Sequence, residues 1–134
     1  MLVIDTSAVL AALVARDKPA GLIKRLADED LSAPHLVDVE VLSGLRRLVV
    51  SRELSDDRAN DARTDFAAMA IIRFPHGGLS DRAWELRHNL SAYDAVYVAL
   101  AEVLGVPLVT CDRRIGAAPG LRAAVELFGP QTNT

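Results

Sequence analysis

Cysteine, lysine and long apolar runs are scarce in this sequence. A single cysteine, Cys111, occurs in 134 residues, which excludes an internal disulfide and fits a reducing compartment. No window reaches the roughly 18 uninterrupted apolar residues that a membrane-spanning helix needs. The N-terminus lacks the basic and apolar regions of a signal peptide. We therefore expect a cytoplasmic protein that does not associate with a membrane.

The overall composition is that of an ordinary globular domain. Hydrophobic residues make up 51% and charged residues 25% of the chain, which argues against disorder. A chain of this length buries about two-thirds of its unfolded surface and needs no covalent cross-links to form a core. The sequence has no internal repeat and no low-complexity tract. Residues 1–134 are therefore expected to form one domain.

The formal net charge of −3 counts, by itself, against a nucleic-acid partner. All but two of the 15 basic side chains are arginines, however, and several are clustered, as at 46–47, Arg52 and 113–114. The guanidinium group binds phosphate through two parallel hydrogen bonds. A coding bias toward Ala and Arg, with solvated arginines on helices, is an equally good explanation for any one of them.

Short apolar runs alternate with helical patterns, which predicts an α/β fold with a mostly parallel sheet. Ser7 or Thr6 is expected to cap the first helix, Ser55 the fourth, and Gly105 to end the sixth. The tail from Gly129 is expected to be loose. Strands are predicted at 2–4, 31–33, 71–74, 107–110 and, at an edge, 124–127; helices are predicted at about 7–15, 19–28, 35–50, 55–69, from 80 through Trp84 and Leu86, 91–104 and 113–117.

Two acids follow directly on predicted buried strands. Asp5 comes after Leu2-Val3-Ile4, and Asp112 comes after Leu108-Val109-Thr110-Cys111. In open α/β sheets, ligands bind beyond the carboxyl ends of the parallel strands, so both acids point to the same edge of the fold. A helix cap is the alternative role for each of them.

Two more acids interrupt apolar stretches. Asp94 lies in the first turn of a helix that is apolar nearly all round, which predicts a buried helix. A buried carboxylate needs a partner, although the capping-box spacing from Ser91 is equally compatible with a cap. Glu40 shares a helical stripe with small residues, including Gly44, that allow close approach. We therefore prefer Glu40 as the site residue over Asp38, which lies on another stripe of the same helix.

Asp5, Glu40, Asp94 and Asp112 together favour a metal site over a covalent mechanism. No lysine, histidine or cysteine is built into the same motifs as a nucleophile. Carboxylate oxygens are the ligands that Mg²⁺ prefers, and Mn²⁺ accepts the same set. Such an ion activates water and stabilises the transition state of phosphodiester cleavage.

These motifs resemble those of the PIN-domain ribonucleases, and the chain looks most like the VapC toxins of bacterial type II toxin–antitoxin pairs. The resemblance covers essentially the whole chain and implies a three-layer α/β/α domain with a central sheet of four to five strands. The segment Tyr93-Asp94-Ala95, with its following apolar helix, is the most specific part. The matching motifs are Val3–Ser7, Glu40, Ser91–Ala101 and Leu108–Arg113.

The resemblance implies a Mg²⁺- or Mn²⁺-dependent endoribonuclease whose catalytic residues are the four acids. Asp5 and Asp94 would ligate the metal directly, and Asp112 directly or through water. Glu40 would ligate the metal, orient water or act as the general base. Thr6 or Thr110 is a candidate for holding a water or phosphate oxygen, with local capping as the alternative.

The family also implies partners. These are an RNA substrate, often tRNA or rRNA, a second copy in a homodimer, and a VapB-like antitoxin, giving a heterotetramer or larger assembly. The antitoxin helix fills an apolar groove, and its basic side chain reaches the acidic pocket. Among the other residues, Arg87, Arg113 and Arg114 are candidate phosphate contacts, whereas Arg46 and Arg47 are expected on a solvated helix face. Cys111 is expected in the core, His88 at the surface, and Trp84 and Tyr93 in the core or an interface rather than stacked on bases.

Two other functions are compatible with parts of the pattern. One is a catalytically inactive PIN scaffold that binds RNA or a protein. The other is a Mg²⁺-dependent phosphotransfer domain of the haloacid-dehalogenase or response-regulator kind. The first kind needs a second aspartate where this chain has Ser7, and the second needs a lysine after a late strand, where this chain has none.

Overall fold

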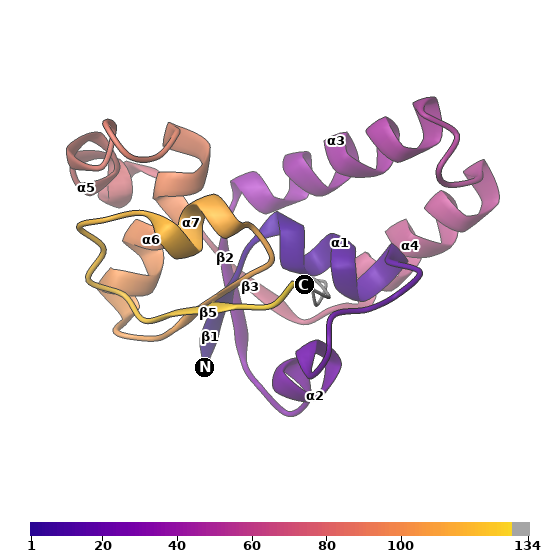
Figure 1. Ribbon diagram of the computed structural model, residues 1–134, viewed down its shortest axis with the longest axis horizontal. Coiled ribbons are helices and arrows are strands. Elements are labelled where there is room, and N and C mark those ends of the chain that lie inside the picture. The colour runs from indigo at the N-terminus through magenta and orange to yellow at the C-terminus, as the bar shows by residue number, and fades with distance from the viewer. Residues whose placement is uncertain (130–134) are drawn as a thin grey trace, which may run out of the picture.

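Five parallel strands form the centre of the computed structural model, which describes residues 1–129 (Figure 1). The predicted loose tail beyond Gly129 lies outside the described residues. The elements are β1 (Leu2–Ile4), α1 (Thr6–Val14), α2 (Leu22–Leu26), β2 (Leu31–Pro34), α3 (Leu36–Val50), α4 (Asp56–Ala68), β3 (Ile71–Phe74), a 3₁₀ turn (Gly77–Leu79), α5 (Ser80–Glu85), α6 (Ala92–Leu104), β4 (Leu108–Thr110), α7 (Arg113–Ala117) and β5 (Val125–Leu127).

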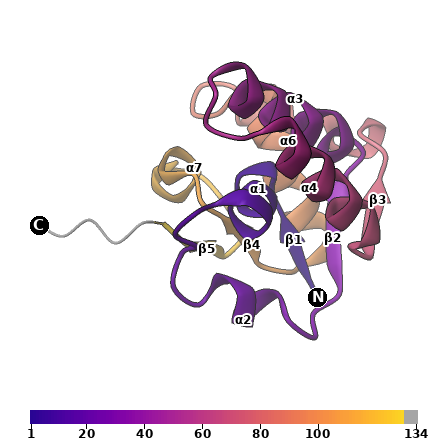
Figure 2. The ribbon, with the colours of Figure 1, turned by 90° about the vertical axis from the view of Figure 1, so that its right-hand side faces the viewer.

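The strand order is β3-β2-β1-β4-β5, and every neighbouring pair is parallel. Helix α1, with α3 and α4 packed around it, covers one face, and α6, with α5 against it, covers the other (Figures 1 and 2). The α/β prediction and the three-layer arrangement are confirmed. The chain leaves β1 toward β2 on one side and leaves β4 toward β5 on the other, so a topological switch point lies between β1 and β4. Ligands bind at such points in α/β folds.

The two central strands are buried along their whole length. Every residue of β1 and of β4 is inaccessible to solvent, because helices cover both faces of the sheet here. This confirms the interpretation of the continuous apolar runs as strands buried on both sides. The chain can therefore place Asp5 and Asp112 immediately beyond two rigid, adjacent strands.

The caps of the helices agree with the sequence prediction except at α1. Asp5, rather than Ser7 or Thr6, caps this helix, because its Oδ1 accepts a hydrogen bond of 2.9 Å from the Ala8 N–H. Ser55 caps α4 as predicted, and Gly105 ends α6 in the left-handed conformation. Helix α2 is shorter than predicted: it begins after Gly21, at φ 82°, and ends before the extended Ala27.

Helix α3 lies close against α1. A Cβ atom built on Gly44 would overlap the Leu10 side chain, so glycine is what permits this distance between the helices. This agrees with the expectation that small residues on the Glu40 stripe allow close approach. The consequence for the site is that α3 brings its Glu40 beside the first residue of α1, Thr6.

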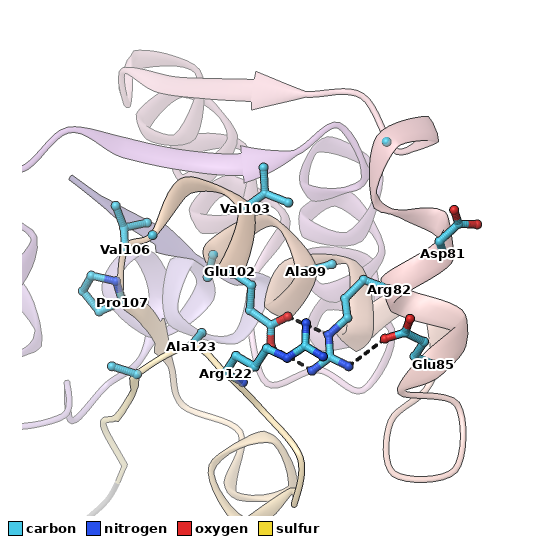
Figure 3. A pocket seen from close by; sticks show the side chains of 14 residues that line it. Asp81, Arg82, Glu85, Ala99, Glu102, Val103, Val106, Pro107, Arg122 and Ala123 are labelled. Atoms are coloured by element: carbon cyan, nitrogen blue, oxygen red, sulfur yellow. Dashed lines mark hydrogen bonds and ion pairs between the residues drawn. The ribbon is translucent and has the colours of Figure 1, made fainter.

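An ion-pair network fastens α5 to α6 and to the segment before β5 (Figure 3). The Arg82 guanidinium donates to Glu102 at 2.7 Å, and to Glu85 at 3.1 Å. Glu102 also accepts the Arg122 N–H at 2.8 Å. These groups line a cavity of about 610 Å³, but each of these carboxylates accepts a hydrogen bond from arginine, which favours a structural role for it.

Two predictions about aromatic residues and α6 need correction. Helix α6 is not buried all round, since Tyr93 is 63% and Val103 68% exposed. Trp84 on α5 is 68% exposed. Neither aromatic residue is therefore in the core, because both lie on the outer faces of helices that bury their opposite faces; a place in an interface, the other alternative for both, stays a prediction. None of the helices within residues 1–129 is long and apolar enough to cross a membrane.

Candidate active site

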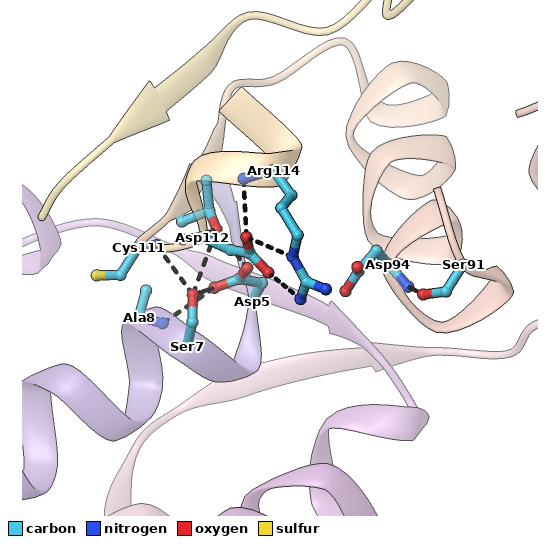
Figure 4. A network of polar contacts seen from close by, with 9 residues as sticks. Asp5, Ser7, Ala8, Ser91, Asp94, Cys111, Asp112 and Arg114 are labelled. Carbon is cyan, nitrogen blue, oxygen red and sulfur yellow. Dashed lines mark hydrogen bonds and ion pairs between the residues drawn. The ribbon is translucent and has the colours of Figure 1, made fainter. Parts of the chain in front are cut away.

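Asp5 is the buried centre of a polar network at the carboxyl ends of β1 and β4 (Figure 4). It is only 4% exposed. Its Oδ1 accepts from the Ser7 hydroxyl at 2.7 Å, and its Oδ2 accepts from the Thr110 hydroxyl at 2.5 Å. Burial raises the pKa of Asp5 to about 6, although these hydrogen bonds oppose the shift. A carboxylate so placed keeps a fixed orientation and favours a cationic partner.

The same hydroxyls connect Asp5 to the segment that carries Asp112. The Ser7 Oγ accepts the Cys111 N–H at 2.9 Å, and the Thr110 Oγ1 accepts the Asp112 N–H at 3.0 Å. The two strand ends are therefore held in register by side chains as well as by the sheet. Local capping was the alternative for Thr110, and its hydroxyl does make this contact by accepting the Asp112 N–H; it also donates across to Asp5.

Glu40 lies in a second hydrogen-bonded group. Its Oε1 is 2.7 Å from the Tyr97 hydroxyl and 3.0 Å from the Thr6 Oγ1, and these two hydroxyls are 2.8 Å apart. Burial raises the pKa of Tyr97, so the phenol remains a neutral hydrogen-bond donor. Asp38, the alternative to Glu40, pairs with Arg73 at 2.8 Å, away from this group.

Asp94 enters from α6 (Figure 4). The Ser91 Oγ caps the helix by accepting the Asp94 N–H at 3.2 Å, so the cap uses the backbone of Asp94. Burial raises the pKa of the half-buried Asp94 carboxyl, and the nearby carboxylates of Asp112 and Glu40 raise it further. The Asp94 carboxylate thus experiences electrostatic repulsion from the other acids of the site.

Asp112 both caps α7 and binds an arginine of that helix. Its Oδ1 accepts the Arg114 N–H at 2.9 Å, and its Oδ2 accepts from the Arg114 Nη2 at 2.9 Å. These contacts lower the pKa of Asp112. Figure 4 shows the Arg114 guanidinium between Asp112 and Asp94.

All four predicted acids line one cavity of about 240 Å³. The structure therefore brings together side chains from the end of β1, from α3 and α6, and from the end of β4, as expected from the sequence. The cavity is lined by Asp5, Thr6, Ser7, Leu10, Glu40, Arg47, Asp94, Tyr97, Asp112 and Arg114.

Three polar residues of this set, and the apolar Leu10, were not expected at the site. Arg47 is exposed, as expected for a solvated helix face, and it also lines the cavity; it lies seven residues after Glu40, on the same helical stripe. Tyr97 lies three residues after Asp94, which also places it on the same face. Ser7 was considered only as a cap. Helical spacing was therefore a usable signal for Arg47 and Tyr97.

Several candidates lie elsewhere. The Arg87 guanidinium is 4.6 Å from the centre of the Trp84 ring, and neither it nor the exposed Arg113 or His88 lines the acidic cavity. Cys111 is half-buried, and burial raises its pKa to about 11, so its thiol is protonated at neutral pH. This supports a packing role for Cys111 rather than a nucleophilic one.

The donors at the site are carboxylate and hydroxyl oxygens, which fit a hard divalent cation in their chemistry. Asp5 also has the buried, immobilised carboxylate that a cation would stabilise. Within residues 1–129, however, no three or more of the acidic, histidine and cysteine side chains lie close enough together to hold a metal ion. Both oxygens of Asp112 accept hydrogen bonds from the Arg114 guanidinium.

The chain is similar to known proteins over most of its length. The PIN-domain family model matches residues 2–121. Ribonuclease VapC1 of Mycobacterium tuberculosis is 44% identical over 127 residues, covering 93% of this chain and 96% of that protein. Ribonuclease VapC9 of the same organism is 49% identical over 115 residues, covering 86% and 88%.

A solved structure shares the fold at low identity. VapBC2 from Rickettsia felis, bound to a DNA fragment from its promoter, superposes with a TM-score of 0.66 and 14% identity, covering 95% of this chain and 98% of the other. The extent of these matches and the arrangement of the four acids lead to one conclusion: this chain belongs to the PIN-domain family, among the VapC ribonucleases.

Proposed function

We propose that this chain is a divalent-metal-dependent endoribonuclease and the toxic component of a type II toxin–antitoxin pair. The observation that carries the proposal is the convergence of Asp5, Glu40, Asp94 and Asp112 on one cavity. Such a cluster of carboxylates is unfavourable without a cation. The high identity to proteins named ribonucleases supports the choice of reaction.

In this proposal the four acids have different tasks. Asp5 and Asp94 hold the cation, Asp5 from a rigid buried position and Asp94 from the first turn of α6. Asp112 is a further ligand, directly or through water. A bound Mg²⁺ or Mn²⁺ supplies an activated water and stabilises the charge of the phosphodiester transition state.

Glu40 is the candidate for orienting the attacking water or taking its proton. Tyr97 and Thr6 both contact one of its oxygens, Oε1, and so leave Oε2 available for this task. General-base catalysis requires such a fixed carboxylate within hydrogen-bond reach of the water. Arg47 and Arg114, which line the cavity, are the candidates for contacting RNA phosphates from this side.

An antitoxin site is proposed beside the acidic cavity. Another cavity, of about 660 Å³, is lined by apolar residues that include Leu10, Val14 and Leu54. Ser7 and Leu10 line both cavities, so a helix lying in this apolar groove can direct a basic side chain toward the acids. The exposed Val39 and Val50 on α3 support the further proposal of a homodimer, and of larger assemblies with the antitoxin.

Two alternatives are distinguished by experiment. A phosphotransfer domain of the haloacid-dehalogenase kind is disfavoured because Ser7 stands where a second acid is needed and is already hydrogen-bonded to Asp5, and one of the response-regulator kind because no lysine follows a late strand. A catalytically inactive scaffold would bind RNA without cutting it. Purified protein with Mg²⁺ should cleave tRNA or rRNA, and a chelator should stop the reaction.

The matched variant is Asp94→Asn, which keeps the size of the side chain and the cap from Ser91. We expect it to retain the fold, measured by circular dichroism, and to lose cleavage. Absence of cleavage by the wild type with Mg²⁺ or Mn²⁺ on any RNA, together with RNA binding, would support the inactive scaffold instead.

A further inference from the structure

Arg114 occupies the place between two acids of the cavity (Figure 4). Its Nε is 3.2 Å from Asp112 Oδ1 and its Nη2 is 2.9 Å from Asp112 Oδ2, a two-pronged contact with one carboxylate. The positive charge also acts on Asp94. Arg47 is the other basic residue lining the cavity. Among the described residues, Arg114 is the only basic residue that donates a hydrogen bond to an acid of this cavity.

The contact uses the oxygens that Asp112 would offer to a metal ion. Both Asp112 oxygens accept hydrogen bonds from the guanidinium. A cation that takes Asp112 as a ligand must therefore compete with Arg114 for at least one of them. The same side chain offsets the repulsion among the carboxylates when no metal is bound.

We propose that Arg114 is the resident counterion of the metal-free site and that a divalent cation displaces it from Asp112 on binding. This inference rests on the proposed function, since it assumes that Asp112 helps to hold a metal. The guanidinium and the cation are alternatives at one carboxylate. Arg114 is thereby a positioning residue that sets the affinity of the site for metal. Its release from Asp112 leaves a free guanidinium group beside the site of RNA cleavage.

The local structure allows this release without unfolding. The Arg114 side chain is 82% exposed, so it can turn away from Asp112 into solvent without disturbing the core. Helix α7 stays anchored by the buried Ile115 and by the Asp112 Oδ1, which accepts the Arg114 backbone N–H whatever the side chain. Substitution of Arg114 therefore changes the charge at the site and leaves the cap intact.

The test is calorimetric titration of the full chain with Mn²⁺ alone, in the absence of RNA. We expect Arg114→Ala to bind Mn²⁺ roughly two- to fivefold more tightly than the wild type, the effect typical of one exposed ion pair. Arg114→Lys should lie between them, because an ammonium cannot engage both oxygens as a fork does. The matched control Arg113→Ala, an exposed neighbour outside the cavity, should bind Mn²⁺ as the wild type does.

Added salt separates this effect from a structural one. Because exposed ion pairs are screened by salt, the difference between the wild type and Arg114→Ala should shrink as ionic strength rises. Equal or weaker Mn²⁺ binding by Arg114→Ala, while the wild type binds Mn²⁺ and cleaves RNA, would overturn this inference alone. Absence of Mn²⁺ binding by every variant would overturn the proposed function as well. If the alanine variant does not fold, the lysine variant decides by the same criterion.

Discussion

The Thr110 hydroxyl donates a hydrogen bond of 2.5 Å to the buried Asp5 carboxylate across the boundary between β4 and β1. The same oxygen accepts the Asp112 N–H. The Thr110 side chain thus holds both the carboxylate of Asp5, the most buried acid of the cavity, and the backbone of Asp112. The position of the cavity depends on this contact because it joins the two strands on either side of the topological switch point.

Thr110→Val should destabilise the protein. The substitution keeps the shape of the side chain, removes a hydrogen bond to a charged group and leaves the Asp112 N–H without its acceptor. We expect a loss of ~1.5–3 kcal/mol in the free energy of unfolding, measured with denaturant. The matched control is Thr64→Val, whose exposed hydroxyl donates to Asn60 within α4; it should change stability by less than ~0.5 kcal/mol. Equal effects of the two substitutions would contradict this role of Thr110.

Asp5 should make metal-free stability fall as pH rises. Its pKa is raised from 3.8 to about 6 on folding, so the unfolded chain ionises first and gains stability relative to the folded chain. The contribution of Asp5 to the unfolding free energy therefore decreases between these two pKa values and stays low above them. Asp5→Asn removes this penalty, which is at most about 3 kcal/mol at ~1.4 kcal/mol per pKa unit.

The measurement is the melting temperature of the metal-free wild type and Asp5→Asn across this pH window. We expect the variant to be as stable as the wild type or more so above about pH 6, with the difference vanishing below the unfolded pKa. A large loss of stability in Asp5→Asn at high pH would show that capping of α1 outweighs the cost of the buried charge.

Glu40→Gln and Asp38→Asn separate a site acid from a surface acid on one helix. Glu40→Gln should reduce RNA cleavage by roughly 10²–10⁴-fold if Glu40 acts as the general base. Asp38→Asn should leave cleavage unchanged and cost less than ~1 kcal/mol of stability, because its contact with Arg73 is partly exposed. Initial rates of cleavage with saturating Mg²⁺ decide the outcome. A similar loss of rate in both variants would refute the assignment of Glu40.

Gly44→Ala should disturb the site from a distance. The added methyl group overlaps Leu10, which lines the acidic cavity, so α1 and α3 must move apart or Leu10 must change its rotamer. Overpacking of this kind typically costs ~1–3 kcal/mol, of which the higher helix propensity of alanine within α3 offsets ~1 kcal/mol. Gly78→Ala, where a Cβ meets no atom within 4 Å, is the control. Thermal unfolding compares the two, and an unchanged melting temperature in Gly44→Ala would mean that the cost at Leu10 is no larger than the gain in helix propensity.

Some features were determined by the sequence alone, because they depend on neighbours within a few residues. The apolar runs before Asp5 and Asp112 predicted buried parallel strands, and the spacing in α6 placed Asp94 in its first turn. The choice of Glu40 over Asp38 followed from helical periodicity, and the structure places Glu40 in the cavity and Asp38 outside it. These patterns are local, so one chain segment is enough to recognise them.

Other features were decided only by the tertiary structure. The pairing of β1 with both β2 and β4 joins segments far apart in the chain, and the β1–β4 pair brings the Thr110 hydroxyl to the Asp5 carboxylate. Arg114 contacts its sequence neighbour Asp112, but the Asp94 carboxylate on the other side of its guanidinium comes from α6 (Figure 4). This arrangement is decided by the packing of elements far apart in the chain, which local spacing does not encode.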